Sequence, residues 1–377
     1  MDFDLTDEQS MLSEAATRFL RKEYTAERRT KAIASDAGHD PEIWSQFADF
    51  GWLGLPISEE AGGLGGGAVD VMVLMETFGE ALVAEPYLGS IIVAARLLDA
   101  TGSQEQRQAI LPDVVEGKRT LAFAFAEPQS RFELNRVATT ARKGDGGFVI
   151  SGHKTMVLNG AAADQLLVLA RTDGEADSRS GLSLFLVTPG PGVRISNFRT
   201  VDGSRAADVV FGAVSVSADA IVGVQGEAFP AVEEAIAFAT LAVAASAIGA
   251  MAAANRITVD YLKMRKQFGV SIGSFQALQH RVVDMTMAHE LAKSLVIAAA
   301  IKMQENSDDR FSLVSAAKHV CGRSGRFIGK NAVQLHGGIG VSQDYIIGHY
   351  LKHLVASDVY FGDSGYHGRK FDSLRRA

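Results

Sequence analysis

The feature that most constrains the fold is the stretch from Ile236 to Ala254, which carries no charged side chain. An uncharged stretch of this length can cross a lipid bilayer. It consists mostly of alanine, however, with Thr240, Ser246 and Gly249 and few large aliphatic side chains. Alanine contributes little to membrane insertion, whereas small residues let helices pack closely. We therefore predict a helix buried at the centre of a bundle, and no membrane association.

The composition of the 377-residue chain is typical of a soluble protein with two or three domains. Its formal net charge of -7 gives no electrostatic reason to bind nucleic acid. Cys321 is the only cysteine, which excludes an intramolecular disulfide and argues against a metal site. We expect Cys321 to be a buried, inert thiol. The acidic start lacks the pattern of a secretion signal, so we predict a cytoplasmic protein.

The apolar pattern divides the chain into three blocks. Residues 1–118 are predicted to be largely helical, with a helix cap at Thr6, and residues 226–377 are helical again. Residues 119–225 contain short β-like runs separated by Gly, Asp and Pro turns. These runs are Leu121–Ala126, Gly147–Ile150, Gln165–Ala170 and Leu182–Val187. Helices, then a compact β unit, then helices indicate an α+β protein.

No glycine pattern in the chain supports a nicotinamide-binding unit. A Gly-x-Gly-x-x-Gly that follows a strand and opens a helix is absent from the sequence. The glycine run Gly62–Gly67 also lacks the Lys-Ser/Thr ending of a P-loop. We interpret it as a loop between helices.

The sequence Arg265-Lys266-Gln267-Phe268-Gly269, followed by Phe275-Gln276, is the strongest candidate for a ligand site. Helical spacing before it places Arg265 near a helix end, with Gly269 as the expected terminator. A guanidinium beside exposed backbone amides suits a pyrophosphate, because its fork donates two parallel charge-assisted bonds. Phe268 is able to lie against an adenine. The alternative is an ordinary solvated helix end.

A second candidate is the stretch Gln334–Gly340, which contains His336 and the adjacent Gly337 and Gly338. Adjacent glycines let a backbone approach a ligand closely and present N–H donors to phosphate. The alternative is a helix end with a tight turn, and a structural role for His336.

Four motifs together resemble those of the acyl-CoA dehydrogenase family, and the resemblance covers nearly the whole chain. Trp52–Gly65 resembles the N-terminal signature and Glu127-Pro128 the middle-domain signature. Arg265–Gly269 with Gln276, and Gln334–Gly340, match the two C-terminal signatures. Four motifs in the family order and spacing form a highly specific match.

The resemblance implies an N-terminal helical domain, a middle β-barrel or sandwich domain and a C-terminal four-helix bundle. It implies FAD as cofactor and α,β-dehydrogenation of an acyl-CoA thioester in lipid metabolism, with an electron-transfer flavoprotein or similar acceptor. A carboxylate takes the α-proton while a hydride passes from the β-carbon to the flavin. The residues that the resemblance assigns to the ADP half of FAD are Arg265, Gln267, Phe268, Phe275, Gln276, Gln334, Gly337 and Gly338.

The catalytic carboxylate of this family is missing at its usual place. Tyr360 and Gly362 match the C-terminal Tyr-Glu-Gly-Thr signature, but Phe361 stands where the glutamate belongs, and a phenyl ring accepts no proton. We therefore assign no catalytic residue. Two weaker alternatives are Asp363, two residues later, and Glu234, which precedes a second family base position near Ala239-Thr240.

The middle domain also departs from the family. Met156 replaces the Trp that covers the flavin, and Leu158 replaces the Thr that bonds near its N5. The motif after Glu127-Pro128 has lost its Gly-Ser pair, since Arg131 and Phe132 stand there.

The family residues that this chain has lost and those that it has kept belong to two different halves of the FAD site. In the family, the flavin ring lies in one subunit and the ADP half is held largely by its neighbour. This chain has lost the first set of residues and kept the second. We predict a non-catalytic subunit of a heteromeric, α2β2 acyl-CoA dehydrogenase, similar to the small subunits of pimeloyl-CoA and steroid-degrading enzymes. The alternatives are a self-sufficient homo-oligomer with a displaced base and a flavin-free scaffold or acyl-CoA-binding protein.

Overall fold

The computed structural model describes residues 5–376 and divides into two compact units, each assembled from distant parts of the sequence. Unit 1 combines the chain up to Arg29, Gly67–Val83 and the chain from Thr240 onwards. Unit 2 combines Thr30–Gly66 and Ala84–Ala239. The domain limits predicted near residues 118 and 225 stay a prediction.

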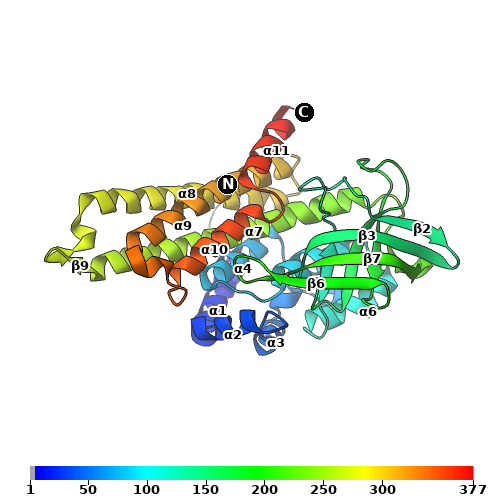
Figure 1. Ribbon diagram of the computed structural model, residues 1–377, viewed down its shortest axis with the longest axis horizontal. Coiled ribbons are helices and arrows are strands. Elements are labelled where there is room, and N and C mark those ends of the chain that lie inside the picture. Colours follow the sequence, from blue (N-terminus) through cyan, green and yellow to red (C-terminus); the bar gives the residue numbers. More distant parts are fainter. Residues whose placement is uncertain (1–4, 377) are drawn as a thin grey trace. The chain divides into compact units, whose positions relative to one another are not determined.

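Unit 1 is helical (Figure 1). Its helices are α1 (Asp7–Glu23), α4 (Ala68–Ala81), α8 (Gln276–Gln304), α9 (Arg310–His336), α10 (Ile347–Val359) and α11 (Ser364–Arg376), with the 3-10 turns η5 (Ile272–Ser274) and η6 (Gly337–Val341). The predicted cap at Thr6 is confirmed, because the Gln9 amide donates to the Thr6 hydroxyl at 3.2 Å. Cys321 is buried, as expected, and burial raises the pKa of its thiol to about 12.

Helix α7 (Phe229–Met264) contains the uncharged stretch and confirms the predicted buried helix. It has the length and composition of a membrane span, yet 94% of its most apolar window is buried inside the structure. Two glycines, Gly249 on α7 and Gly79 on α4, let the backbones of these two helices come into contact. A Cβ added to Gly249 would lie 1.8 Å from the carbonyl oxygen of Glu76, and one added to Gly79 would lie 1.8 Å from that of Ser246. The small residues therefore set the helix spacing.

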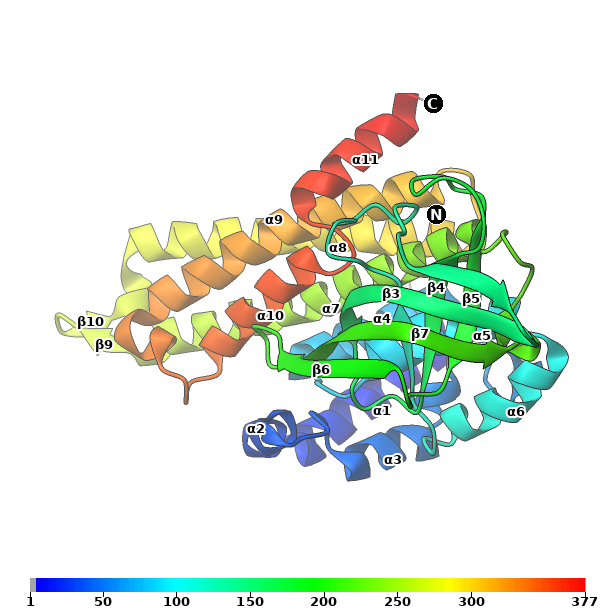
Figure 2. The ribbon, with the colours of Figure 1, turned by 45° about the vertical axis from the view of Figure 1, so that its right-hand side comes forward.

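Unit 2 contains an eight-stranded sheet, and helices precede and follow its strands in the sequence (Figures 1 and 2). The strands are β1 (Leu121–Ala124), β2 (Thr140–Gly144), β3 (Gly147–Leu158), β4 (Gln165–Arg171), β5 (Leu182–Val187), β6 (Val193–Arg199), β7 (Arg205–Ser217) and β8 (Ile221–Val222). The order is β6-β7-β3-β2-β4-β5-β8, and β1 pairs with β4 in parallel. The four predicted β runs are confirmed, and the α+β fold class with them.

The remaining helical elements are short, and one of them is a π-helix. They are α2 (Ala26–Ala34), α3 (Pro41–Asp49), α5 (Arg96–Thr101), α6 (Gln104–Val115), η1 (Trp52–Gly54), η2 (Glu59–Ala61), the π-helix η3 (Tyr87–Ala95) and η4 (Ala218–Ala220). The π-helix is buried and packs on the sheet. A Cβ on Gly89 would come within 3.0 Å of the Leu158 Cβ at the end of β3. The loop Gly62–Gly67 joins η2 to α4, as the glycine run predicts.

The backbone contact between α4 and α7 leads to a stability prediction. Gly249→Ala places a methyl group against the Glu76 carbonyl and should lower the free energy of unfolding by about 3 kcal/mol or more. The matched control is Gly190→Ala, because a Cβ at Gly190 has only one neighbour, at 3.9 Å. Urea unfolding followed by circular dichroism measures both. Equal stability of the two variants would contradict the close contact.

Candidate functional site

The first ligand motif forms a hairpin at one end of the helical unit (Figures 1 and 2). Helix α7 ends at Met264, and the strands β9 (Lys266–Gln267) and β10 (Val270–Ser271) pair in antiparallel register. Phe268 and Gly269 form the tip with φ of 55° and 81°. The prediction that Gly269 terminates the helix is therefore wrong. The helix ends earlier because the chain reverses, and the Ser271 hydroxyl lies 2.7 Å from the Leu262 carbonyl.

The side chains of this hairpin are exposed. Phe268 is 91% exposed and Phe275 39%, and their ring centroids lie 6.3 Å apart. Arg265 and Gln267 are exposed, and Gln276 is the exposed first residue of α8. The five residues of the predicted set thus come together on one solvent-facing loop. An aromatic ring this exposed is unusual in a soluble chain and suits a surface that a ligand or another subunit covers.

The second motif lies at the end of α9. Gln334 is exposed, Gly337 ends the helix with φ of 63°, and a Cβ on Gly337 or Gly338 would meet nothing within 4 Å. The two motifs are joined by an aromatic stack, because the His336 ring lies 4.4 Å from that of Tyr261, one turn before Arg265. Burial lowers the pKa of His336, which favours its neutral ring. Its Nδ1 lies 2.8 Å from the Ala332 carbonyl. This gives His336 a structural role.

The two motifs fit the ADP half of a dinucleotide. Open glycine backbone offers N–H donors to a pyrophosphate, and the Arg265 guanidinium supplies positive charge beside it. Phe268 offers an aromatic face to a base.

The position of the missing base lies in the loop between α10 and α11. Phe361 has φ of 59° and Gly362 has φ of 120°, so the backbone is held in a conformation that phenylalanine rarely adopts. The Phe361 carbonyl lies 3.1 Å from His367 Nε2. The Lys318 ammonium donates to the carbonyls of Ser357, Asp358 and Gly362 at 2.7, 2.9 and 2.8 Å. The loop is therefore rigid, although Phe361 brings it no proton acceptor.

Lys318 and His367 hold the loop at Phe361, and the sequence did not reveal these contacts. The carbonyls that Lys318 binds are 39–44 residues away in the sequence. Lys318 belongs to α9 and is 1% exposed, and its ammonium contacts carbonyls at the C-terminal end of α10, where a cation is favourable. Burial lowers the pKa of Lys318 to about 8. Burial, with help from Lys318, lowers the pKa of His367 to about 3.

Both alternative carboxylates have local structural partners. Asp363 caps α11, since its Oδ1 accepts from the Tyr366 amide at 2.7 Å. Glu234 lies in the unbroken helix α7, where its charge acts on the partly buried Arg96. That arginine stacks on Phe238, with its guanidinium carbon 3.6 Å from the ring centroid.

The middle-domain departures sit at the end of β3. Met156 has φ of 53° at an irregularity in the pairing with β7, and Leu158 packs against Gly89. Neither side chain offers a hydrogen-bond donor. The flavin-ring half of the family site is thus a poor fit here, in contrast to the ADP half.

A buried ion pair fixes the loop that begins with Glu127-Pro128. Lys154 Nζ lies 2.7 Å from Glu127 Oε1, with the side chains 0% and 2% exposed. The Glu127 carboxylate also accepts from the amides of Ala138 and Thr139 at 2.8 and 3.0 Å. Burial alone would raise the pKa of Glu127, but the Lys154 charge and these bonds lower it to about 2. The sequence motif showed Glu127 without its partner.

Comparison with known proteins now decides the family. Family models match the acyl-CoA dehydrogenase N-terminal domain over residues 6–118, the middle domain over 122–215 and the C-terminal domain over 226–370. The chain belongs to the acyl-CoA dehydrogenase family. FAD is the cofactor of this family. Acryloyl-CoA reductase (NADH) of Anaerotignum propionicum is 30% identical over 97% of this chain and 94% of its own length.

Two solved structures cover all of the chain. A chain in a structure of the electron transferring flavoprotein of Acidaminococcus fermentans is 28% identical with a TM-score of 0.91, and all of that chain is covered. A chain of the ChsE4-ChsE5 complex from Mycobacterium tuberculosis is 26% identical with a TM-score of 0.90, with 99% covered. The acyl-CoA dehydrogenase fold of this chain follows, with a helical C-terminal bundle.

The buried Glu127–Lys154 pair leads to a second stability prediction. Lys154→Met leaves a buried, uncompensated carboxylate and should lower the free energy of unfolding by about 3–5 kcal/mol. The double variant Glu127→Gln with Lys154→Met should recover part of that loss. Lys302→Met, in the exposed pair with Glu305, is the control and should change stability by less than about 0.5 kcal/mol. Urea unfolding midpoints test all three.

The loop at Phe361 should make stability depend on pH through His367. The folded state keeps His367 neutral down to about pH 3, whereas the unfolded chain takes up a proton near pH 6.5. The stability contribution is therefore complete above pH 6.5 and is lost as the pH falls, by about 1.4 kcal/mol per unit at most. The groups whose charge acts on His367 are Lys318, Lys370 and Asp363.

Urea unfolding from pH 7 to pH 4 measures this dependence. His367→Gln should flatten the curve relative to the unmodified protein, and His153→Gln, at an exposed site on β3, should not. Parallel curves for the unmodified protein and His367→Gln would show that another group controls the acid sensitivity.

Proposed function

We propose that this chain is the non-catalytic subunit of a heteromeric acyl-CoA dehydrogenase and holds the ADP half of FAD for a homologous catalytic subunit, in an α2β2 assembly. The observation that carries the proposal is the contrast within the chain. The exposed hairpin and the open Gly337-Gly338 backbone keep the ADP-binding set. The rigid loop at Phe361 has no carboxylate at the family's base position.

An apolar face beside the hairpin supports a partner subunit. Val283, Met287 and Leu291 lie at successive turns of α8 and are 55%, 61% and 60% exposed. Phe275, which is also exposed, precedes the first residue of the same helix, and its ring lies 6.3 Å from that of Phe268 on the hairpin. A row of exposed apolar side chains that ends at a cofactor motif suits a contact with a homologous chain.

In the proposed complex, this chain binds and orients the cofactor. Arg265 neutralises the pyrophosphate, and the backbone of Gly337 and Gly338 donates hydrogen bonds to it. Bound FAD would supply a hydride acceptor for the acyl β-carbon, and the partner would supply the glutamate that removes the α-proton. An electron-transfer flavoprotein or similar acceptor would reoxidise the complex.

The similarity to a ChsE4-ChsE5 chain supports a two-protein assembly. We propose a cytoplasmic enzyme that acts on a bulky acyl-CoA, of the steroid or dicarboxyl type.

The flavin-to-protein ratio tests the proposal. Alone, the chain should purify without FAD and without dehydrogenase activity. Co-expressed with the homologous catalytic subunit, the complex should bind one FAD for every two subunits. Arg265→Ala should lower the affinity of the complex for FAD at least about tenfold, and with it the FAD content, because a charge-assisted bond to phosphate is lost. Arg142→Ala, an exposed arginine on β2, should have no effect.

Conservative variants distinguish the self-sufficient enzyme. Asp363→Asn keeps a helix cap but removes the carboxylate, and Glu234→Gln removes the other. Neither should change the kcat of the complex by more than about twofold, since loss of a general base is expected to lower it about 100-fold or more. A yellow, active homo-oligomer that loses activity in either variant would overturn the proposal. A stable heteromer without FAD would favour the scaffold.

A further inference from the structure

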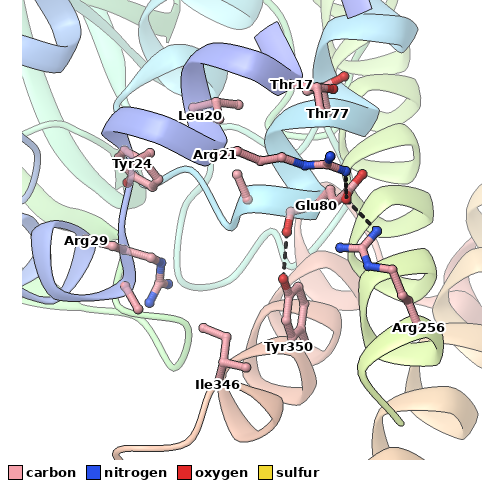
Figure 3. Close-up of a pocket in the computed structure, with 12 residues that line it drawn as sticks. Thr17, Leu20, Arg21, Tyr24, Arg29, Thr77, Glu80, Arg256, Ile346 and Tyr350 are labelled. Carbon is pink, nitrogen blue, oxygen red and sulfur yellow. Dashed lines mark hydrogen bonds and ion pairs between the residues drawn. The ribbon is translucent and has the colours of Figure 1, made fainter. Parts of the chain in front are cut away.

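A pocket of 230 Å³ lies within unit 1, and none of the cofactor-motif residues lines it (Figure 3). Its walls come from α1, the start of α2, α4, α7 and the segment that leads into α10. Drug-sized ligands occupy pockets of about 300–1,000 Å³. A ligand of this pocket is therefore small.

Arginine side chains give the pocket a positive charge. Arg21, Arg29 and Arg256 line it, and Glu80 is the one acidic lining residue in the described part of the chain. Arg256 NH1 lies 2.6 Å and Arg21 NH2 3.8 Å from the same Glu80 oxygen (Figure 3). The guanidinium groups of Arg21 and Arg256 share one carboxylate, so one positive charge remains on these two exposed arginines.

The base of the pocket is fixed by hydrogen bonds. Tyr350 donates its hydroxyl proton to the Glu80 carbonyl at 2.6 Å, and Arg29 donates from Nε to the Leu82 carbonyl at 2.7 Å. Arg29 is 5% exposed, whereas the side chains of Arg21 and Arg256 are 70% and 51% exposed. The two exposed guanidinium groups are therefore the ones that a ligand can reach.

Apolar groups also line the pocket. Leu20, Ala81 and Ile346 line the pocket together with the ring of Tyr24. An inorganic ion would leave these groups against water, whereas an aliphatic chain would cover them. One uncompensated positive charge matches a monoanion better than a phosphate, which carries more than one negative charge near pH 7.

We propose that this pocket binds a small monocarboxylate, with the carboxylate between Arg21 and Arg256 and a short aliphatic chain against Leu20 and Ile346. Such a ligand joins α1 to α7 and α10. The carboxylate competes with Glu80 for the same guanidinium groups. The site is separate from the proposed ADP-binding set, because none of those residues lines it.

Calorimetric titration of the full-length protein with butyrate tests the site. Butyrate should bind saturably, and butylamine should not bind. Arg256→Gln should weaken butyrate binding about tenfold or more, because it removes a charge-assisted bond. Glu80→Gln should tighten it, because both guanidinium groups lose their competitor. Arg142→Gln serves as the control, and the circular dichroism spectrum of each variant shows that it is folded.

Opposite shifts for Arg256→Gln and Glu80→Gln would not follow from a merely structural network, where both changes should act in the same direction. Butyrate should also slow hydrogen exchange in residues 17–24 of the unmodified protein. Binding unchanged by Arg256→Gln, or weakened by Glu80→Gln, overturns the proposal. Inorganic phosphate that binds as tightly as butyrate overturns the choice of a monocarboxylate.

Discussion

The enclosure of the uncharged part of α7 is the constraint on which the rest of the structure depends. A helix without charges along its middle has to be covered by protein on nearly all sides, and its alanines let the neighbours approach. The glycine contacts with α4 bring two backbones together at Gly79 and Gly249. The same helix leads into the hairpin that carries the candidate ADP-binding motif, because the hairpin begins where α7 ends at Met264. The position of these candidate residues therefore follows from how α7 is packed.

The sequence predicted those features that depend on local pattern. The β runs, the Thr6 cap and the buried helix each follow from the periodicity or chemistry of neighbouring residues, and the structure confirms them. The hairpin at Phe268 and Gly269 was missed, because a helix followed by glycine usually reads as a helix end. The signal that would have found it is the two-residue sequence Phe268-Gly269, which ends in glycine as two-residue hairpin loops often do. Both residues have positive φ, and they reverse the chain between Lys266-Gln267 and Val270-Ser271.

Contacts between distant residues were beyond the sequence. Lys154 and Glu127 are buried together, and Lys318 reaches three carbonyls around the loop after α10, yet nothing in the spacing of these residues identifies their partners. Each lysine ammonium is shielded from water and donates its hydrogen bonds to fixed oxygen atoms of the protein instead. Such networks hold the loops that carry a site, so they determine the geometry of the site. The sequence motif contains only one residue of each such contact and does not identify its partner.

The loop at Phe361 shows what the chain has retained. A left-handed conformation at a bulky residue costs about 1–3 kcal/mol and persists only where surrounding contacts impose it. Here Lys318 and His367 impose it, although the side chain at that position brings no acid–base chemistry. The backbone of this loop is thus held in place although no carboxylate stands at the family's base position. A loop of this kind remains useful if its shape, and not its proton chemistry, is what the assembly needs.

The exposed ring of Phe268 is a second feature that suits an assembly, because an aromatic side chain held in water gains stability only when another surface covers it. Both features support the proposed assembly, in which a homologous subunit would bring the base and place its flavin against this chain.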